Sequence, residues 1–238
     1  MISFQPTCRY LVCPRLRKRN SWLMKQFLGK KVIIWDWNGT LLDDVGYCVE
    51  CINVLLKKRN LPKVTTNLYR EIFTFPVIDY YKAVGFDLEK EGFEKPAMEF
   101  IGLYYKNFHQ TKLFPCVQEV LKDFQENGFK QVVLSAMEHD SLVKTLGEKG
   151  ILKYFDEVTG VGDHYGSSKE ETGKRLLKNL QIQPEDAVII GDTLHDKQVA
   201  DSLNIDLILV STGHNSEQRL KAAHPVVIDK LDGVTRLI

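Results

Sequence analysis

The chain has 238 residues, 44% of them hydrophobic and 26% charged, and its formal net charge is +1 at pH 7. This composition is that of a globular protein with one sizeable core and a smaller subdomain, and no segment has the apolar length that would cross a bilayer, which excludes a membrane-spanning protein. The five cysteines are odd in number and lack the spacing of a disulfide framework or zinc ribbon, so we expect a reducing, cytoplasmic location.

Residues 1–23 differ from the rest of the chain in charge. They hold five basic side chains and no acidic one, and the remainder carries 27 basic against 31 acidic side chains, a net charge of −4. We expect this basic extension to lie outside the fold. A start codon assigned too early, with Met24 as the natural beginning, is our leading explanation, and an Arg-rich transit peptide or a basic anion-binding arm are the alternatives. The mildly acidic remainder argues against a nucleic-acid partner.

The first predicted strand ends at a group of polar residues. Residues 32–35 read Val-Ile-Ile-Trp without polar alternation, which indicates a central parallel strand covered on both faces. Asp36 follows at the carboxyl end of this strand, where open α/β sheets bind their ligands. Gly39 permits a backbone conformation that a Cβ would obstruct.

The next stretch is helical in period. A helix is predicted over residues 44–60 and ends before Pro62, and residues 63–110 continue with helical spacing, many aromatic side chains and no strand-like run. We interpret residues 45–110 as a helical cap inserted between the first two strands, and residues 24–44 and 111–238 as the catalytic core. Cys48 and Cys51 form a CxxC on the first helix, which favours two thiols on a helix face over a redox or metal site.

After Pro115 the chain alternates regularly between helices and strands. Helices are predicted over 115–127, 138–149, 168–181, 195–203 and 216–223, and strands over 130–135, 156–160, 187–191, 206–210 and 226–228. Helices of this length between strands imply right-handed βαβ units. The predicted fold class is therefore α/β, with a Rossmann-like parallel sheet core and an inserted α-helical cap.

Four motifs in chain order resemble those of the haloacid dehalogenase-like hydrolases. The first is Asp36-Trp37-Asn38-Gly39-Thr40, and the others are Ser135 at the end of VVLS, Lys169 in SSK, and Asp192 with Asp196 in GDTLHD. Each residue has an ordinary alternative explanation, as a helix cap, a strand-end hydroxyl or a solvated lysine. The resemblance rests on the combination of the four motifs and on their order. Together with the helical insertion, it points to the phosphoglycolate phosphatase-like branch of the family.

The resemblance implies a Mg²⁺ site and a covalent mechanism. One oxygen of Asp36, the backbone carbonyl of Asn38 and the side chain of Asp192 would bind Mg²⁺, and Asp196 would reinforce that shell. Oxygen ligands without His or Cys favour Mg²⁺ over zinc, and a cation is needed because a phosphate dianion is repelled by carboxylates. The other oxygen of Asp36 would be the nucleophile, giving an aspartyl-phosphate.

The phosphate itself would be bound by groups from the later motifs. The resemblance implies a hydrogen bond from the hydroxyl of Ser135, another from the backbone N–H of Ala136, and charge stabilisation by Lys169. Lys174 is the second choice for the lysine, because it lies farther into the helix.

Position 38 departs from the family pattern. Phosphatases of the family carry an acid there that protonates the leaving alcohol, and Asn38 keeps the main-chain ligand but cannot transfer a proton. Three outcomes are open: activity through another acid or water, a slow phosphatase or phosphoryl-transfer enzyme, or a phosphate-ligand-binding or regulatory protein on the same frame. We expect retained hydrolase activity.

A cap that closes over the site favours small substrates. We expect a small phosphorylated metabolite, such as phosphoglycolate or a sugar phosphate, with Tyr80, Tyr81 and Lys82 as candidates for contacting its organic part. Packing between cap helices explains the presence of the two tyrosines at least as well as contact with the substrate does. His195 lies in the last motif without an evident partner, and the other histidines are scattered and suggest no zinc site.

Overall fold

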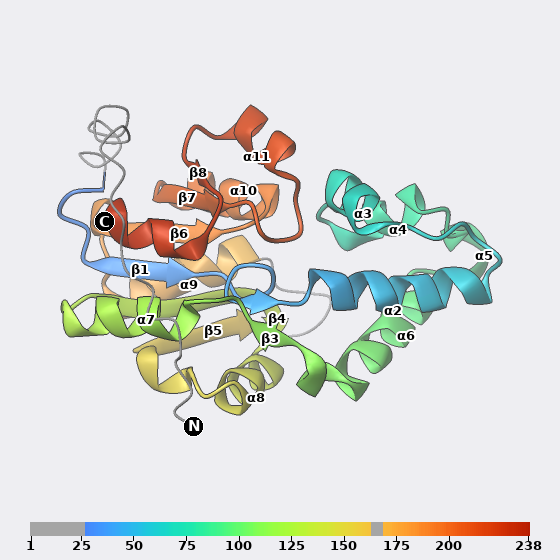
Figure 1. Ribbon diagram of the computed structural model, residues 1–238, viewed down its shortest axis with the longest axis horizontal. Helices are drawn as coiled ribbons and strands as arrows, with labels where there is room; N and C mark the ends of the chain where they lie inside the picture. The colour runs from blue at the N-terminus through green and yellow to red at the C-terminus, as the bar shows by residue number, and fades with distance from the viewer. Residues whose placement is uncertain (1–26, 163–168) are drawn as a thin grey trace, which may run out of the picture.

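In the computed structural model, which describes residues 27–162 and 169–238, a six-stranded parallel sheet forms the centre of the molecule (Figure 1). The strand order is β5 (Glu157–Val161), β4 (Lys130–Glu138), β1 (Val32–Trp35), β6 (Ala187–Gly191), β7 (Asp206–Val210) and β8 (Val227–Ile228). The predicted α/β class is confirmed. The basic extension of residues 1–23 lies outside the described residues.

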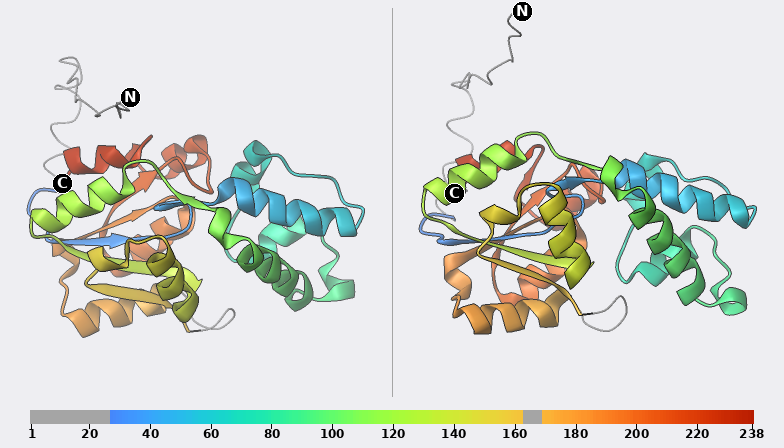
Figure 2. Two further views of the ribbon diagram at one scale, coloured as in Figure 1. Left: turned by 60° about the horizontal axis from the view of Figure 1, so that its bottom comes forward. Right: turned by 90° about the horizontal axis from the view of Figure 1, so that it is seen from below.

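Helices cover both faces of the sheet (Figure 2). One face packs against α7 (Val117–Glu126), α8 (His139–Glu148) and the 3₁₀ turns η3 (Leu152–Tyr154) and η5 (Leu231–Arg236), and the other against α9 (Lys169–Leu180), α10 (Leu194–Leu203) and α11 (Glu217–Ala223), with η4 (Pro184–Asp186) leading into β6. Ile33 and Trp35 belong to the first hydrophobic cluster and Val32 and Ile34 to the second. This division explains why β1 shows no polar alternation. No helix in the described ranges has both the length and the apolar composition for a membrane span.

Residues 45–110 form a layer of helices beyond the carboxyl ends of the strands, which we call the cap layer (Figures 1 and 2). It consists of α2 (Val45–Lys58), α3 (Thr66–Ile72), α4 (Val77–Ala83), α5 (Leu88–Glu91), α6 (Glu94–Lys106) and the 3₁₀ turn η2 (Phe108–Gln110). The chain enters and leaves this layer through a short antiparallel pair, β2 (Leu42–Asp43) and β3 (Lys112–Leu113). These strands were not predicted from the sequence, because two residues are too few to show a period.

A set of hydrogen bonds links the cap layer to the loop after β7 and to α11. Asn215 Nδ2 donates to the carbonyl of Phe73 at 3.0 Å, and Arg219 Nη1 donates to the same carbonyl at 2.8 Å and to that of Arg70 at 2.9 Å. In return, Arg70 Nη2 donates to the carbonyl of Thr212 at 2.7 Å. The carbonyls at the end of α3 lack partners within that helix, so donors from the core satisfy them.

A buried glutamine ties three elements together below the site. Gln131 in β4 is fully buried, and its Oε1 accepts a hydrogen bond from Trp35 Nε1 at 3.1 Å. Its Nε2 donates to the carbonyl of Leu121 at 2.8 Å and to that of Tyr154 at 3.3 Å. One side chain therefore joins β1, α7 and η3 inside an apolar cluster.

Replacing Gln131 with leucine should destabilise the fold, because Trp35 Nε1 would be buried without a partner. Leaving a buried polar group unsatisfied costs about 1–3 kcal/mol, so we expect Gln131→Leu to lower the free energy of unfolding, measured by urea denaturation, by about 1–3 kcal/mol. Gln118→Leu on the exposed face of α7 is the matched control and should change it by no more than about 0.5 kcal/mol. Equal effects of the two substitutions would contradict this account.

Candidate active site

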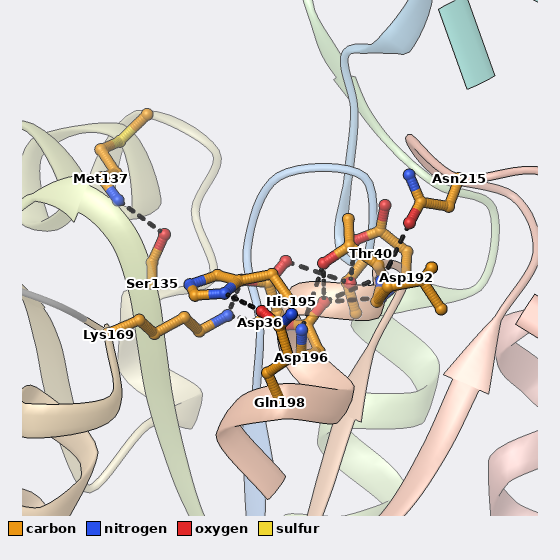
Figure 3. Close-up of polar contacts among 12 residues, drawn as sticks. Asp36, Thr40, Ser135, Met137, Lys169, Asp192, His195, Asp196, Gln198 and Asn215 are labelled. Atoms are coloured by element: carbon orange, nitrogen blue, oxygen red, sulfur yellow. Dashed lines mark hydrogen bonds and ion pairs between the residues drawn. The ribbon is translucent and has the colours of Figure 1, made fainter. Parts of the chain in front are cut away.

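Three adjacent strands deliver the candidate residues to one place (Figure 3). Asp36 follows β1, Ser135 lies in β4 on one side of β1, and Asp192 follows β6 on the other side. Because parallel strands end at the same edge of a sheet, these side chains lie close together. Asp196 is in the first turn of α10, and Lys169 is the first residue of α9.

Lys169 is buried between two carboxylates. Its Nζ lies 2.5 Å from Asp36 Oδ1 and 2.6 Å from Asp196 Oδ1, and only 4% of the residue is exposed. Although burial alone would lower the pKa of Lys169, Asp196 and Asp36 raise it above its ordinary value. The lysine is therefore a fixed positive charge beside Asp36. Lys174, the second choice, is exposed on α9.

Asp196 holds the start of α10 in place. Its Oδ2 accepts hydrogen bonds from Thr193 N at 2.9 Å, Thr193 Oγ1 at 2.7 Å and Asp192 N at 3.1 Å, which completes a capping box with Thr193 as the N-cap. Burial opposes ionisation of Asp196, but Lys169 and these donors keep its pKa below the ordinary value. Both oxygens are thus engaged, so Asp196 supports the site through its neighbours.

Asp36 and Asp192 are held together by one hydroxyl. Thr40 Oγ1 lies 2.9 Å from Asp192 Oδ1 and 3.3 Å from Asp36 Oδ2, and a single hydroxyl proton serves only one of them at a time. Burial raises the pKa of Asp36 to about 6 in spite of Lys169, and burial raises that of Asp192 well above its ordinary value. Gly39 makes this approach possible: its φ is +75°, and a Cβ there would lie 2.4 Å from Asp192 Oδ2.

The three acids have the chemistry of a hard-metal site. Oxygens of Asp36, Asp192 and Asp196 lie within 4.8 Å of one another, and all three residues are buried. The raised pKa values of Asp36 and Asp192 indicate buried negative charge that Lys169 does not fully compensate. A divalent cation would supply the missing charge, and an all-oxygen donor set fits Mg²⁺.

Ser135 is almost fully buried, and its Oγ accepts a hydrogen bond from Met137 N at 3.1 Å. Strand β4 runs on to Glu138, three residues beyond the predicted end, and its register with β5 shifts between Leu134 and Glu138. This irregular segment brings Ser135 and Ala136 to the wall of the same cavity as Asp36 and Lys169.

Asn38 belongs to a polar network that its sequence context does not indicate. Its Nδ2 donates to Asp44 Oδ2 and to the hydroxyl of Tyr104, both at 2.8 Å. Asp44 also receives the Gly39 N–H at 3.0 Å and lies 3.2 Å from His214 Nε2. His214 connects the network to the acids, because its backbone N–H donates to Asp192 Oδ2 at 2.6 Å. The structure therefore places a buried carboxylate beside the amide at position 38.

Asp44 and His214 form an ion pair. Burial disfavours charge on each group, but Asp44 raises the pKa of His214 to about 9, and His214 together with Tyr104 and Asn38 holds the pKa of Asp44 below its ordinary value. The other ring nitrogen of His214 is 2.8 Å from the hydroxyl of Tyr69. The only signal for this pair in the sequence is the place of His214 in the loop after β7, next to the strand that carries Asp192.

A cavity of about 240 Å³ lies between these residues and the cap layer. Tyr80 and Tyr81 are buried against it, whereas Lys82 is outside the lining and lies 3.5 Å from Asp79. His195 lines the cavity, stacks on Phe75 with ring centroids 4.6 Å apart, and lies 3.2 Å from Gln198 Oε1. Cys48 is buried near Asp44, and burial raises its pKa well above the ordinary value, so it remains a neutral thiol.

Comparison with known proteins finds a matching family and several similar phosphatases. Residues 33–210 match the model of the haloacid dehalogenase-like hydrolase family. Phosphoglycolate phosphatases of Nitrosococcus oceani and Psychrobacter arcticus are 26% and 27% identical to this chain, over 87% and 83% of it and 96% and 90% of their own lengths. A predicted phosphatase from Clostridium acetobutylicum has a similar structure, with a TM-score of 0.75 at 21% identity, covering 87% of this chain and 97% of that one.

The His214–Asp44 pair should make stability fall at alkaline pH. Because folding raises the pKa of His214 from 6.5 to about 9, its contribution is complete below pH 6.5 and is lost as the pH rises through 9. We expect the free energy of unfolding from urea titrations to fall by about 2–3 kcal/mol over that interval. His214→Gln should remove most of this slope, and the exposed control His139→Gln should retain it. A slope unaffected by His214→Gln would show that another group is responsible.

Proposed function

The chain belongs to the haloacid dehalogenase-like hydrolase family, in its phosphoglycolate phosphatase-like branch, and from this premise we propose that it is a Mg²⁺-dependent phosphatase of small phosphomonoesters. The observation that supports this most strongly is the convergence of Asp36, Ser135, Lys169 and Asp192 from three adjacent strands and α9. These groups line or adjoin one cavity, and they supply a nucleophile, a cation and phosphate-binding donors.

In the proposed site, Asp36, the backbone carbonyl of Asn38 and Asp192 hold Mg²⁺, and Asp196 supports them. Asp196 has the supporting role because its two oxygens already serve Lys169 and the start of α10. When bound, Mg²⁺ supplies positive charge for a phosphate oxygen and helps to orient phosphorus for in-line attack.

The two carboxylate oxygens of Asp36 face different groups. Its Oδ2 faces Thr40 and Asp192, and its Oδ1 faces Lys169. We assign Oδ1 as the nucleophile that attacks phosphorus and forms an aspartyl-phosphate, which water then hydrolyses. Lys169 keeps Asp36 ionised and stabilises charge on the transferred group, and Ser135 Oγ and the N–H of Ala136 bind its oxygens.

The proton for the leaving group does not come from position 38. The amide of Asn38 does not titrate, and it is engaged with Asp44 and Tyr104. General acid–base catalysis contributes about 10²–10⁴-fold to such reactions, so the proposed enzyme is slow toward alcohols that must be protonated as they leave.

A second candidate function rests on the same observation. If the hydrogen bonds of Asn38 fix it in a purely structural role, the chain binds a phosphorylated ligand without turning it over, as a regulatory protein. The two functions differ in one measurement, which is release of inorganic phosphate by the wild-type protein in Mg²⁺.

We expect Asp36→Asn to abolish phosphatase activity. The substitution preserves shape and relieves burial of a charge, so it should not unfold the protein, but it removes the nucleophile and should lower kcat at least about 10³-fold. Phosphate release from p-nitrophenyl phosphate, phenyl phosphate and 2-phosphoglycolate, with and without EDTA, is the measurement. Asp43→Asn, an exposed aspartate seven residues along, is the control and should retain activity. An Asp36→Asn protein within tenfold of wild type would refute the assigned mechanism.

Restoring an acid at position 38 should require a second change. In Asn38→Asp alone the new carboxylate would face Asp44, because the present amide nitrogen is 2.8 Å from Asp44 Oδ2. The double variant Asn38→Asp, Asp44→Asn reverses the direction of the hydrogen bond between these two side chains. It should raise kcat for an alkyl phosphate about 10–100-fold above that of Asn38→Asp alone. Asp44→Asn alone is the control for loss of the His214 ion pair. A single variant as fast as the double one would contradict this role of Asp44.

A further inference from the structure

The half of the cavity that faces the cap layer is lined by aromatic rings. Phe73 and Phe75 come from the end of α3 and the loop after it, Tyr80 from α4, and Phe100 and Tyr104 from α6. Several of these rings contact one another at centroid distances of 5.3–6.1 Å, as in the Phe73–Tyr80 and Phe100–Tyr104 pairs. Such a lining stabilises an apolar, planar group by burial and by ring contacts.

The cationic side chains of the described lining are already paired with carboxylates. The ammonium of Lys169 lies between Asp36 and Asp196, and His214 Nε2 lies 3.2 Å from Asp44 Oδ1. The acidic lining residue on the wall next to Ser135 is Glu138, whose carboxylate accepts the N–H groups of Asp140 and Ser141. A substrate carboxylate in the aromatic half would lose its hydration and, among these residues, would have to compete with Asp36, Asp196 or Asp44 for a cationic partner. The described lining therefore does not suit the carboxylate of 2-phosphoglycolate.

Tyr80 and Tyr81 line the cavity and also pack within the cap layer. The hydroxyl of Tyr80 makes no hydrogen bond within the described part of the chain, but it is closed to solvent and does not border the open cavity. Contact of the two tyrosines with the organic part of the substrate remains a prediction.

The chemistry at position 38 also restricts the leaving group. With Asn38 unable to donate a proton, the leaving oxygen departs as an anion. A phenol has a pKa of about 10, whereas alkyl alcohols resemble water, whose pKa is about 16. A phenolate therefore leaves without the help that an alkoxide requires.

We propose that the substrate is an aryl phosphate, a phosphate monoester of an uncharged aromatic ring whose phenolic oxygen is the leaving group. The inference rests on the proposed function and names its substrate class. Asp36 Oδ1 forms a bond to phosphorus as the bond to the aryl oxygen breaks, and the electron pair of that bond stays on the phenolate. Water then attacks phosphorus and releases Asp36, so that aryl phosphate and water give a phenol and inorganic phosphate. The cavity of about 240 Å³ has room for this ligand, since a cavity of about 150 Å³ binds benzene.

The test separates fit to the cavity from leaving-group chemistry. Phenyl phosphate, benzyl phosphate and 2-phosphoglycolate are compared by kcat/KM in Mg²⁺, and phenylphosphonate and phosphonoacetate, which are not cleaved, are compared by calorimetric Kd. We expect phenyl phosphate to exceed 2-phosphoglycolate at least 100-fold in kcat/KM and phenylphosphonate to bind at least tenfold more tightly than phosphonoacetate. Benzyl phosphate keeps the ring but leaves as an alkoxide, so its KM should lie within about threefold of that of phenyl phosphate and its kcat should be at least tenfold lower.

Two variants test the cavity wall. Ile101 lines the cavity from α6. Ile101→Arg should strengthen binding of phosphonoacetate relative to phenylphosphonate, so that the ratio of their Kd values changes at least tenfold. Met98→Arg adds the same charge at an exposed position of α6 and should leave the ratio unchanged.

The outcomes distinguish this inference from the proposed function. Turnover with 2-phosphoglycolate preferred, or equal Kd values for the two phosphonates, would overturn the aryl class and leave the phosphatase in place. Tight and selective binding of phenylphosphonate without turnover of any substrate would refute the phosphatase and support an aromatic phosphate ligand for a binding protein.

Discussion

The site depends on the burial of three carboxylates around one ammonium group. Lys169 forms ion pairs with Asp36 and Asp196. Asp192 is the third carboxylate, and burial raises its pKa. Much of the neighbouring structure keeps these charges in place: the capping box of α10 fixes Asp196, the hydroxyl of Thr40 lies between Asp36 and Asp192, and Gly39 leaves space for Asp192. Since buried like charges are unfavourable without a counter-charge, this cluster is costly for an isolated chain and useful for binding a cation.

Much of this arrangement could be predicted from the sequence, because the strands that carry it have a strong local pattern. The apolar runs 32–35 and 187–191 are buried on both faces, and their ends locate Asp36 and Asp192. The roles of these residues in catalysis and metal binding remain predictions. Other features depend on contacts between distant segments. Asp44 directly precedes a helix and has the sequence context of an ordinary N-cap, yet its side chain makes no capping bond and pairs with His214, 170 positions away. No local period records such a contact.

The two features that bear on the substrate meet at Tyr104, which binds Asn38 and also belongs to the aromatic lining. The hydrogen bonds of Asn38 to Asp44 and Tyr104 account for an amide at this position in structural terms. The aromatic lining comes from α3, α4 and α6, which have no part in the charge cluster. A leaving group that needs no proton and a cavity that favours planar apolar groups are both satisfied by one class of ester. The sequence led us to expect phosphoglycolate or a sugar phosphate, and the aryl ester is our proposal in place of these.

The entry and exit of the cap layer meet in the β2–β3 pair, where Leu42 lies opposite Leu113 and Asp43 opposite Lys112. Because the two ends of this inserted helical segment are neighbours, the order and register of the six-stranded sheet do not depend on the helices between them. Insertions, deletions or an exchanged set of helices between these two points can therefore alter substrate preference over evolutionary time while the charge cluster stays intact. The same property makes this pair the natural junction for building chimaeras between relatives.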